Sequence, residues 1–193
     1  MLSRIIRQTH MYLALFFMPW MLMYALSTML MNHGPVFRKP PQFAVEREQT
    51  YTAAFPPDAG PRQMAQQVLS DLGMDGAHGV GKPGPGGRLT INRLDPVAPR
   101  RITYTPADGK LIVERQLFRA PALLERLHRR RGFQQPYLID DAWGLSVDLV
   151  IAAMVLWLAS GLWMWWELRI TRRLGALSIA TGLALFGFFL LTI

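Results

Sequence analysis

The sequence predicts a membrane α-helical protein with three transmembrane helices and a small antiparallel α+β domain between the first and the second. Two observations favour this fold class. Hydrophobic residues make up 51% of the 193 residues, and they are concentrated in three long runs, Met11–Met31, Trp143–Trp166 and Leu174–Ile193. The segment between the first two runs is instead rich in proline, glycine and charge, with short alternating patterns typical of strands.

Each run is long enough to cross a lipid bilayer. A hydrocarbon core of roughly 30 Å takes about 20 apolar residues, because a helix rises about 1.5 Å per residue. Two of the runs contain no charged residue and the other contains only Asp148, whereas a helix of a soluble protein rarely runs so far without charge. We therefore expect residues 1–32 to hold a cytoplasmic start and the first span, 142–168 the second span and 174–193 the third.

The first run also resembles a secretory signal, because Arg4 and Arg7 precede it. Two features favour an uncleaved anchor instead. The run exceeds the roughly 7–15 apolar residues of a cleaved signal, and no small-x-small site follows, since Met29–Asn32 is bulky. Pro19 lies inside the run, where a membrane helix tolerates it with a kink.

The short segments beside the runs predict the orientation in the membrane. Two arginines precede the first span, and three lie in the link 169–173. Because short basic segments stay in the cytoplasm, we expect the N-terminus and this link to be cytoplasmic and the domain 33–141 to be periplasmic, in the inner membrane of a bacterium. The net charge of +8 is then partly a topology signal. We expect the lipid bilayer and other membrane subunits as partners, and no nucleic acid.

Several function classes are excluded by the composition and the motifs. The chain contains no cysteine, which excludes disulfides, thiolate metal sites, iron–sulfur clusters and covalent c-type haem. Neither a His-Glu-x-x-His nor a Gly-x-Ser-x-Gly motif is present. Prolines in the Gly76–Gly87 loop remove amides that a phosphate cradle needs. Whether the chain is an enzyme stays open, because no self-contained catalytic constellation is visible.

The patterns within 33–141 predict one helix lying on an antiparallel sheet of three or four strands. Met64, Val68 and Leu72 recur at helical spacing after Pro61, and the turn Pro106–Gly109 separates two alternating segments. We expect a helix at Pro61–Leu72 ended by Gly73, a loop at Gly76–Gly87, strands at Gln42–Tyr51, Arg88–Leu94, Arg101–Thr105 and Lys110–Arg115, and an amphipathic helix at Arg119–Arg130.

These residues resemble a known family. The helix Pro61–Leu72 and the stretch Gly87–Arg115, which reads GRLTINRLDPVAPRRITYTPADGKLIVER, are similar to a PepSY domain. The segments Arg7–His10, Leu127-His128, Trp143–Leu145 and Ser160–Trp166 are similar to the transmembrane part of PepSY-associated proteins. The chain thus resembles a short PepSY-associated transmembrane protein with a PepSY-like external domain. Larger relatives have four or more spans and more histidines, and Ser27-Thr28 lacks the glycine that the family often carries there.

The resemblance implies two kinds of function. Some members of the wider family are similar to membrane ferric reductases that hold b-type haem between pairs of histidines, and others are accessory or regulatory proteins. The resemblance alone does not choose between them. It therefore makes haem b a candidate cofactor and the histidines its candidate ligands.

The four histidines differ in their suitability as haem ligands. His10 and His33 are about 35 Å apart along one helix and differ by about 140° around it, so they cannot share a haem. We expect His33 and His128 to meet at the outer membrane face as axial ligands of one haem iron. His10 needs a partner from another subunit, and His78 is expected to be a solvated loop residue. The alternative for His10, His33 and His128 is an interfacial polar residue that caps a helix end.

Three functions remain open. The first is a haem protein that passes electrons to a periplasmic acceptor. The second is a non-catalytic accessory subunit of a larger membrane complex, packed through the small residues of the third span. The third is a regulator of an envelope protease. Asp148 is either an interfacial charge or a partner of another subunit or a histidine. An inner aromatic belt is expected from Trp157, Trp163, Trp165 and Trp166.

Overall fold

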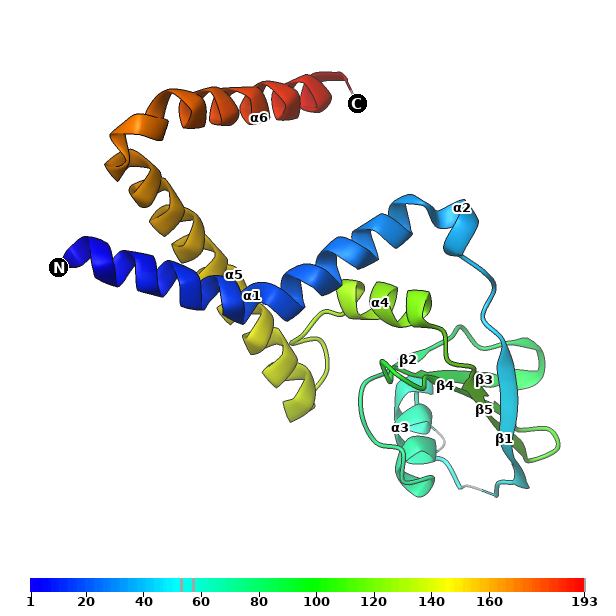
Figure 1. Ribbon diagram of the computed structural model, residues 1–193. Coiled ribbons are helices and arrows are strands. Elements are labelled where there is room, and N and C mark those ends of the chain that lie inside the picture. The colour runs from blue at the N-terminus through cyan, green and yellow to red at the C-terminus, as the bar shows by residue number, and fades with distance from the viewer. Residues whose placement is uncertain (53, 57, 193) are drawn as a thin grey trace. The chain divides into compact units, whose positions relative to one another are not determined.

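The computed structural model describes residues 1–52, 54–56 and 58–192. The chain forms a helical unit, Met1–Met21 with Ser146–Ile193, and an α/β unit, Leu22–Leu145. In chain order the elements (Figure 1) are α1 (Leu2–Asn32), α2 (Gly34–Phe37), β1 (Phe43–Thr50), α3 (Pro61–Asp71), β2 (His78–Val80), the 3-10 turn η1 (Pro85–Gly87), β3 (Leu89–Arg93), β4 (Arg100–Thr105), β5 (Lys110–Gln116), α4 (Ala120–Arg129), α5 (Leu138–Glu167), the 3-10 turn η2 (Arg169–Thr171) and α6 (Arg172–Thr192).

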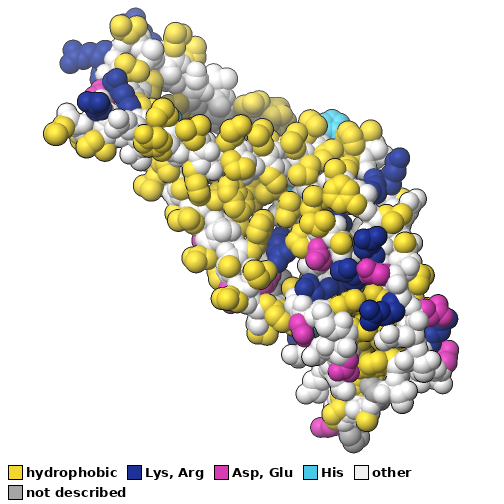
Figure 2. All heavy atoms as spheres, turned by 60° about the horizontal axis from the view of Figure 1, so that its bottom comes forward, with side chains coloured by type: hydrophobic (Ala, Val, Ile, Leu, Met, Phe, Trp, Pro, Cys, Tyr) yellow, Lys and Arg dark blue, Asp and Glu magenta, His cyan; other side chains and the backbone are white. Residues whose placement is uncertain are grey.

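Three helices are long and apolar enough to cross a membrane, as the hydrophobic runs predict. They are α1, α5 and the stretch Arg169–Thr192, with mean hydropathies of 1.7, 2.1 and 2.1. Most of their large hydrophobic side chains are exposed. Figure 2 shows many hydrophobic side chains on the face drawn. Exposed apolar side chains along the length of a helix mark a surface that lipid or another protein covers.

The helices extend beyond the apolar runs. Helix α1 begins at Leu2, so the basic residues before the first run are helical. The link expected at 169–173 is shorter than that, because α6 already begins at Arg172. The indole of Trp165 donates to Thr171 O at 3.4 Å, and Arg172 Nε donates to Trp166 O at 2.8 Å. These bonds fix the turn between α5 and α6.

The sheet of the α/β unit has five antiparallel strands in the order β1-β5-β4-β3-β2. The expected strands are present, and no strand end is shifted by more than one residue. The turn Pro106–Gly109 joins β4 to β5, and Gly109 has the positive φ of 62° that glycine adopts without strain. Strand β1 lies at the edge beside β5, with a register shift between Val45 and Arg47.

The fifth strand, β2, lies where a loop was expected. Its three residues are rich in glycine and carry no strong strand pattern. The strand forms because β3 pairs with it on one side, with His78 opposite Arg93. On its other side the Gln135 side chain accepts from His78 N at 2.8 Å and donates to His78 O at 2.6 Å. The Gln135 side chain thus bonds to the backbone N–H and C=O of His78 that a further strand could otherwise pair with.

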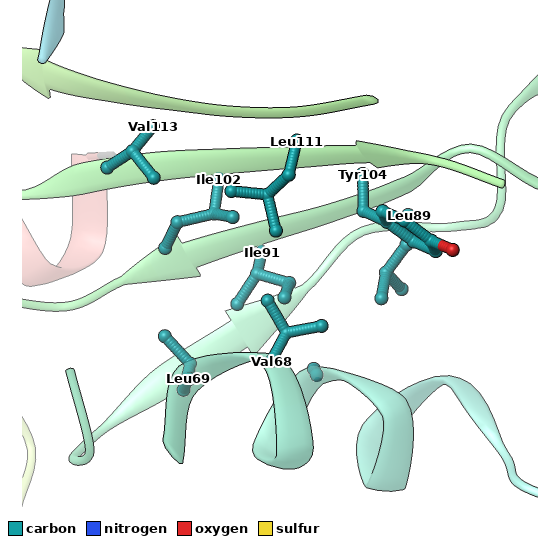
Figure 3. Packing of buried hydrophobic residues seen from close by; sticks show 9 residues of the cluster. Val68, Leu69, Leu89, Ile91, Ile102, Tyr104, Leu111 and Val113 are labelled. Carbon is teal, nitrogen blue, oxygen red and sulfur yellow. The ribbon is translucent and has the colours of Figure 1, made fainter. Parts of the chain in front are cut away.

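Helix α3 covers one face of the sheet and forms the core with it (Figure 3). Val68 and Leu69 point from α3 toward the strands, and Ile91, Ile102 and Leu111 point back from β3, β4 and β5. All five side chains are 0–1% exposed. The spacing of the apolar residues along α3 and their alternation along the strands therefore place one face of each element in a single core.

The C-terminal end of α3 confirms the expected role of Gly73. This glycine has φ 65°, a left-handed conformation that residues with a Cβ adopt at a cost. Its N–H donates to Ser70 O at 2.9 Å, and Met74 N donates to Leu69 O at 2.8 Å. These bonds satisfy carbonyls that the last turn leaves without helical partners.

Truncation of the sheet core tests this packing. We expect Ile91→Ala to lower the free energy of unfolding of the α/β unit by about 2–5 kcal/mol, because it removes apolar contacts and leaves a cavity. Val97→Ala, at a loop residue that is 57% exposed, is the control, with a change within about 0.5 kcal/mol. Pulse proteolysis of the full chain in detergent, across a urea series, measures both. Equal resistance of Ile91→Ala and the wild type would contradict the assigned core.

Candidate functional site

His10 lies in α1 and is held by residues of α5 within the helical unit. Its Nδ1 is 2.9 Å from Ser160 Oγ. The Ser160 hydroxyl donates its only hydrogen to Trp157 O, at 2.8 Å. His10 Nδ1 is therefore assigned as the donor to Ser160 Oγ. The ring also stacks on Trp157, with centroids 5.1 Å apart and planes 13° apart.

Small and aromatic side chains shape the surroundings of His10. A Cβ at Gly161 would lie 3.3 Å from His10 Cε1, so the glycine allows the ring to approach α5 closely. Phe17 packs edge-on against Trp157 at 6.0 Å and is 3% exposed. Trp157 Nε1 is buried and has no hydrogen-bond partner among the described residues. The indole thus has an unused donor beside the imidazole.

His128 lies in α4 and is held by α1 within the α/β unit. Its Nδ1 is 2.7 Å from Ser27 Oγ, and the Ser27 hydroxyl donates to Tyr24 O at 2.9 Å. The same reasoning makes Nδ1 the donor in this ring. Tyr24 meets the imidazole edge-on, with centroids 5.0 Å apart. Ser27 is 0% exposed, so His128 is the partner that its buried hydroxyl oxygen has on another helix.

The two histidines therefore share one arrangement. In each, a serine gives its hydrogen to the carbonyl three residues earlier and accepts a hydrogen bond from the imidazole Nδ1. The aromatic residue at that earlier position contacts the imidazole ring. Neither Nε2 has a hydrogen-bond partner among the described residues. Both rings thus have a fixed orientation, with Nδ1 engaged and Nε2 available.

The imidazole rings of His33 and His78 form hydrogen bonds only to backbone oxygens that are close to them in the chain. His33 Nδ1 donates to Met29 O at 2.9 Å, and the residue is exposed. His78 was expected in a solvated loop, but it is half-buried in β2, where its Nδ1 donates to Gly76 O at 2.9 Å. This difference follows from the tertiary pairing of β2, which the local sequence does not show.

The expected axial pair, His33 and His128, is not in contact. His128 lies against Ser27, and Ser27 and His33 differ by about 120° around a helix of 3.6 residues per turn. The helical unit contains His10 as its only histidine. Asp148, considered as a partner of a histidine, is exposed on α5 and forms no ion pair in the part of the chain that the structure describes.

The chemistry of the donor set fits a haem that is held without covalent attachment. An axial imidazole needs a free nitrogen lone pair, and its other nitrogen normally donates to an oxygen, which fixes the ring and raises its basicity. In all four histidines Nδ1 bonds to an oxygen, and His10 and His128 are the two whose oxygen is a serine hydroxyl on another helix. A haem held by His10 would need a second ligand from outside the helical unit, because that unit has no further histidine. The described residues contain no group of three or more His, Asp or Glu placed to hold a metal ion.

The serines and aromatic rings that hold the histidines were not found from the sequence. Residues 10 and 160 are far apart in the chain, and no spacing rule connects them. The available signal was a polar residue in each apolar run, since a hydroxyl inside a membrane helix needs a partner. Trp157 was grouped with an aromatic belt, whereas in the structure it contacts His10.

Comparisons of the chain with protein-family models, with curated proteins and with solved structures give no significant match.

The contact at Gly161 yields a prediction. We expect Gly161→Val to lower the stability of the helical unit by about 1–3 kcal/mol, because the added side chain forces the His10 ring away from Ser160 and Trp157. Gly182→Val is the matched control, since a Cβ at Gly182 in α6 meets nothing within 4 Å. Thermal unfolding of both variants in the same detergent gives the comparison. A lower unfolding temperature for both variants alike would rule out a specific contact at Gly161.

Proposed function

We propose that the chain is an integral protein of a bacterial inner membrane that crosses the bilayer three times. The N-terminus and the turn between α5 and α6 lie in the cytoplasm, and the α/β unit lies in the periplasm. Three helices of sufficient length and hydropathy support this proposal. Two arginine contacts support it as well. The Arg172 guanidinium lies 4.8 Å from the Trp166 ring centroid, and Arg7 pairs with Glu167 at 3.5 Å. Basic and aromatic residues are typical of the cytoplasmic boundary.

The α/β unit is proposed to be a PepSY-like domain. The resemblance rests on the helix that begins at Pro61 and on the stretch Gly87–Arg115. In the structure these residues form α3 and the strands β3, β4 and β5, which pack into one core. A single helix on an antiparallel sheet in this order supports the proposal without depending on any one motif.

The function that the site supports best is electron transfer through b-type haem. The observation that carries it is the serine-held pair of histidines, His10 and His128, each with Nδ1 engaged and Nε2 free. His128 is the ligand proposed at the periplasmic face and His10 the one proposed at the cytoplasmic face, whereas His33, which is turned away from His128, is not brought to the same site. A haem held by these residues would supply one-electron transfer to a periplasmic acceptor, as in a ferric reductase.

The residues of the chain have distinct tasks in this proposal. Ser27 and Ser160 orient the rings and hold the proton on Nδ1. Tyr24 and Trp157 cover the rings and exclude solvent from one side. The donor of Trp157 Nε1, which has no partner among the described residues, is free to bind an oxygen of a ligand beside His10.

The second candidate is an accessory subunit of a larger membrane complex. The observation that favours it is α6, none of whose described residues is buried. Its small residues, Gly175, Ala176, Ala180, Gly182, Ala184 and Gly187, allow another helix to approach closely. In this function the serine-held histidines are contacts between helices only.

An absorption spectrum separates the two candidates. We expect the purified full chain, expressed with haem precursor, to show reduced-minus-oxidised bands of a b-type haem. His128→Ala is expected to lose at least about half of the haem per chain, because it removes an axial nitrogen. His78→Ala is the control, since this histidine lies on the sheet edge and binds Gly76 O.

Two results would contradict haem binding. The first is a wild-type protein that stays colourless after purification and after incubation with haemin. The second is an equal loss of haem in His78→Ala and His128→Ala. A colourless chain that copurifies in fixed stoichiometry with other membrane proteins would support the accessory function instead.

A further inference from the structure

A basic pocket lies within the α/β unit, between α4, the loop Leu94–Pro99 and the segments Arg38–Pro41 and 129–135. Its volume is about 730 Å³, within the roughly 300–1,000 Å³ of sites that hold small molecules. Among the described residues, seven Lys and Arg side chains line it against three carboxylates. The pocket therefore has an excess of positive charge, which an anion can balance.

One of the three carboxylates is already used by the protein backbone. Asp95 accepts hydrogen bonds from Ala98 N and Val97 N, both at 2.9 Å. These bonds hold the pKa of Asp95 below its usual value. The carboxylate thus stays ionised and closes the loop, and its lone pairs are turned toward the backbone.

The other two carboxylates are shared or distant. Glu125 lies 3.2 Å from Arg129 and 3.7 Å from Arg38, so one negative charge serves two guanidinium groups. Asp140 is 4% exposed and reaches Arg130 only at 3.5 Å. The acidic residues of the pocket therefore leave its positive charge incompletely balanced.

Two further arginines have hydrogen-bond partners without charge. Arg126 donates from Nε to Pro96 O at 2.9 Å and from Nη1 to Gln116 Oε1 at 3.3 Å. Burial lowers the pKa of Arg126, which shows that its charge is partly removed from water. Arg119 donates to two backbone carbonyls, at 2.9 and 3.1 Å. Neutral acceptors fix both groups in place and leave their charges free to attract an anion.

Arg130 supplies an independent sign of a missing partner. Its Nε is buried and has no hydrogen-bond partner among the described residues. A buried donor without an acceptor costs roughly 1–3 kcal/mol, so an oxygen of a ligand at this position is stabilising. The guanidinium itself lies 3.5 Å from Asp140 Oδ1 and 5.6 Å from the Trp143 ring centroid, and the Trp143 indole donates to the backbone Arg130 O at 3.4 Å.

We infer that this pocket binds a phosphate ester with an apolar body, from either a soluble molecule or an acidic phospholipid. Guanidinium groups from α4, from the segment after it and from Arg38 surround the space on several sides. This arrangement suits the three or four oxygens of a tetrahedral phosphate better than a planar carboxylate. Leu94, Pro41, Pro96 and Pro99 line the remaining wall and accommodate the apolar part. The inference does not depend on haem binding.

Titration calorimetry with phenyl phosphate tests the site. The full chain in a neutral detergent is expected to bind phenyl phosphate with a stoichiometry of about one and not to bind benzyl alcohol, which lacks the charge. Arg130→Gln is expected to raise the Kd about tenfold, since it removes a charge-assisted contact. The double variant Arg129→Gln/Arg131→Gln, at the exposed rim, is expected to do the same if Arg130→Gln fails to fold. Arg62→Gln, an exposed cation at the start of α3, is the control and keeps the wild-type Kd.

Nanodiscs distinguish the two sources of the phosphate. Phenyl phosphate binding in phosphatidylcholine discs that disappears in phosphatidylglycerol discs assigns the pocket to a lipid headgroup. Equal binding in both assigns it to a soluble molecule. No binding in detergent or in phosphatidylcholine discs overturns the inference. Binding that Arg62→Gln weakens as much as the pocket variants, or that benzyl alcohol reproduces, also overturns it.

Discussion

A hydrogen bond from an imidazole to a serine hydroxyl on another helix organises both histidine sites. The hydroxyl has one hydrogen, which in both sites goes to a carbonyl of its own helix. Its oxygen is then left as an acceptor for a donor from another helix. His10 and His128 supply that donor, and the ring orientation and the unengaged Nε2 follow from it. The proposed haem ligation uses Nε2 of each ring, which has no hydrogen-bond partner among the described residues.

Helix α4 connects the two proposals without mixing them. It carries His128, whose ring lies against Ser27 and Tyr24 of α1. It also carries Arg126 and Arg129, which line the basic pocket. None of its described residues is fully buried, so α4 adds little to the sheet core, and we interpret its amphipathic pattern as a means of presenting functional side chains. A change in the pocket arginines can therefore leave the histidine site in place.

The sequence predicted most of the secondary structure because local rules govern it. The apolar runs, the turn ended by Gly109 and the glycine after α3 each act within a few residues, and the structure contains all three features. Strand β2 was missed because its strand character comes from β3 and from the side chain of Gln135. The histidines were recognised as candidates, but their serine partners were not, since the pairs join residues more than a hundred positions apart. The basic pocket was not predicted from the sequence, because its walls come from several segments that are far apart in the chain.

The central claim is that His10 and His128 each donate from Nδ1 to a serine oxygen and leave Nε2 without a hydrogen-bond partner. Nitrogen NMR of the full chain labelled with ¹⁵N-histidine tests it directly, since four histidines give few signals and the two tautomers have different shifts. We expect Nδ1–H rings, with Ser160→Ala changing the signals of His10 alone and Ser27→Ala those of His128 alone. Rings protonated on Nε2 in the wild type, or unchanged signals in both serine variants, would contradict the account.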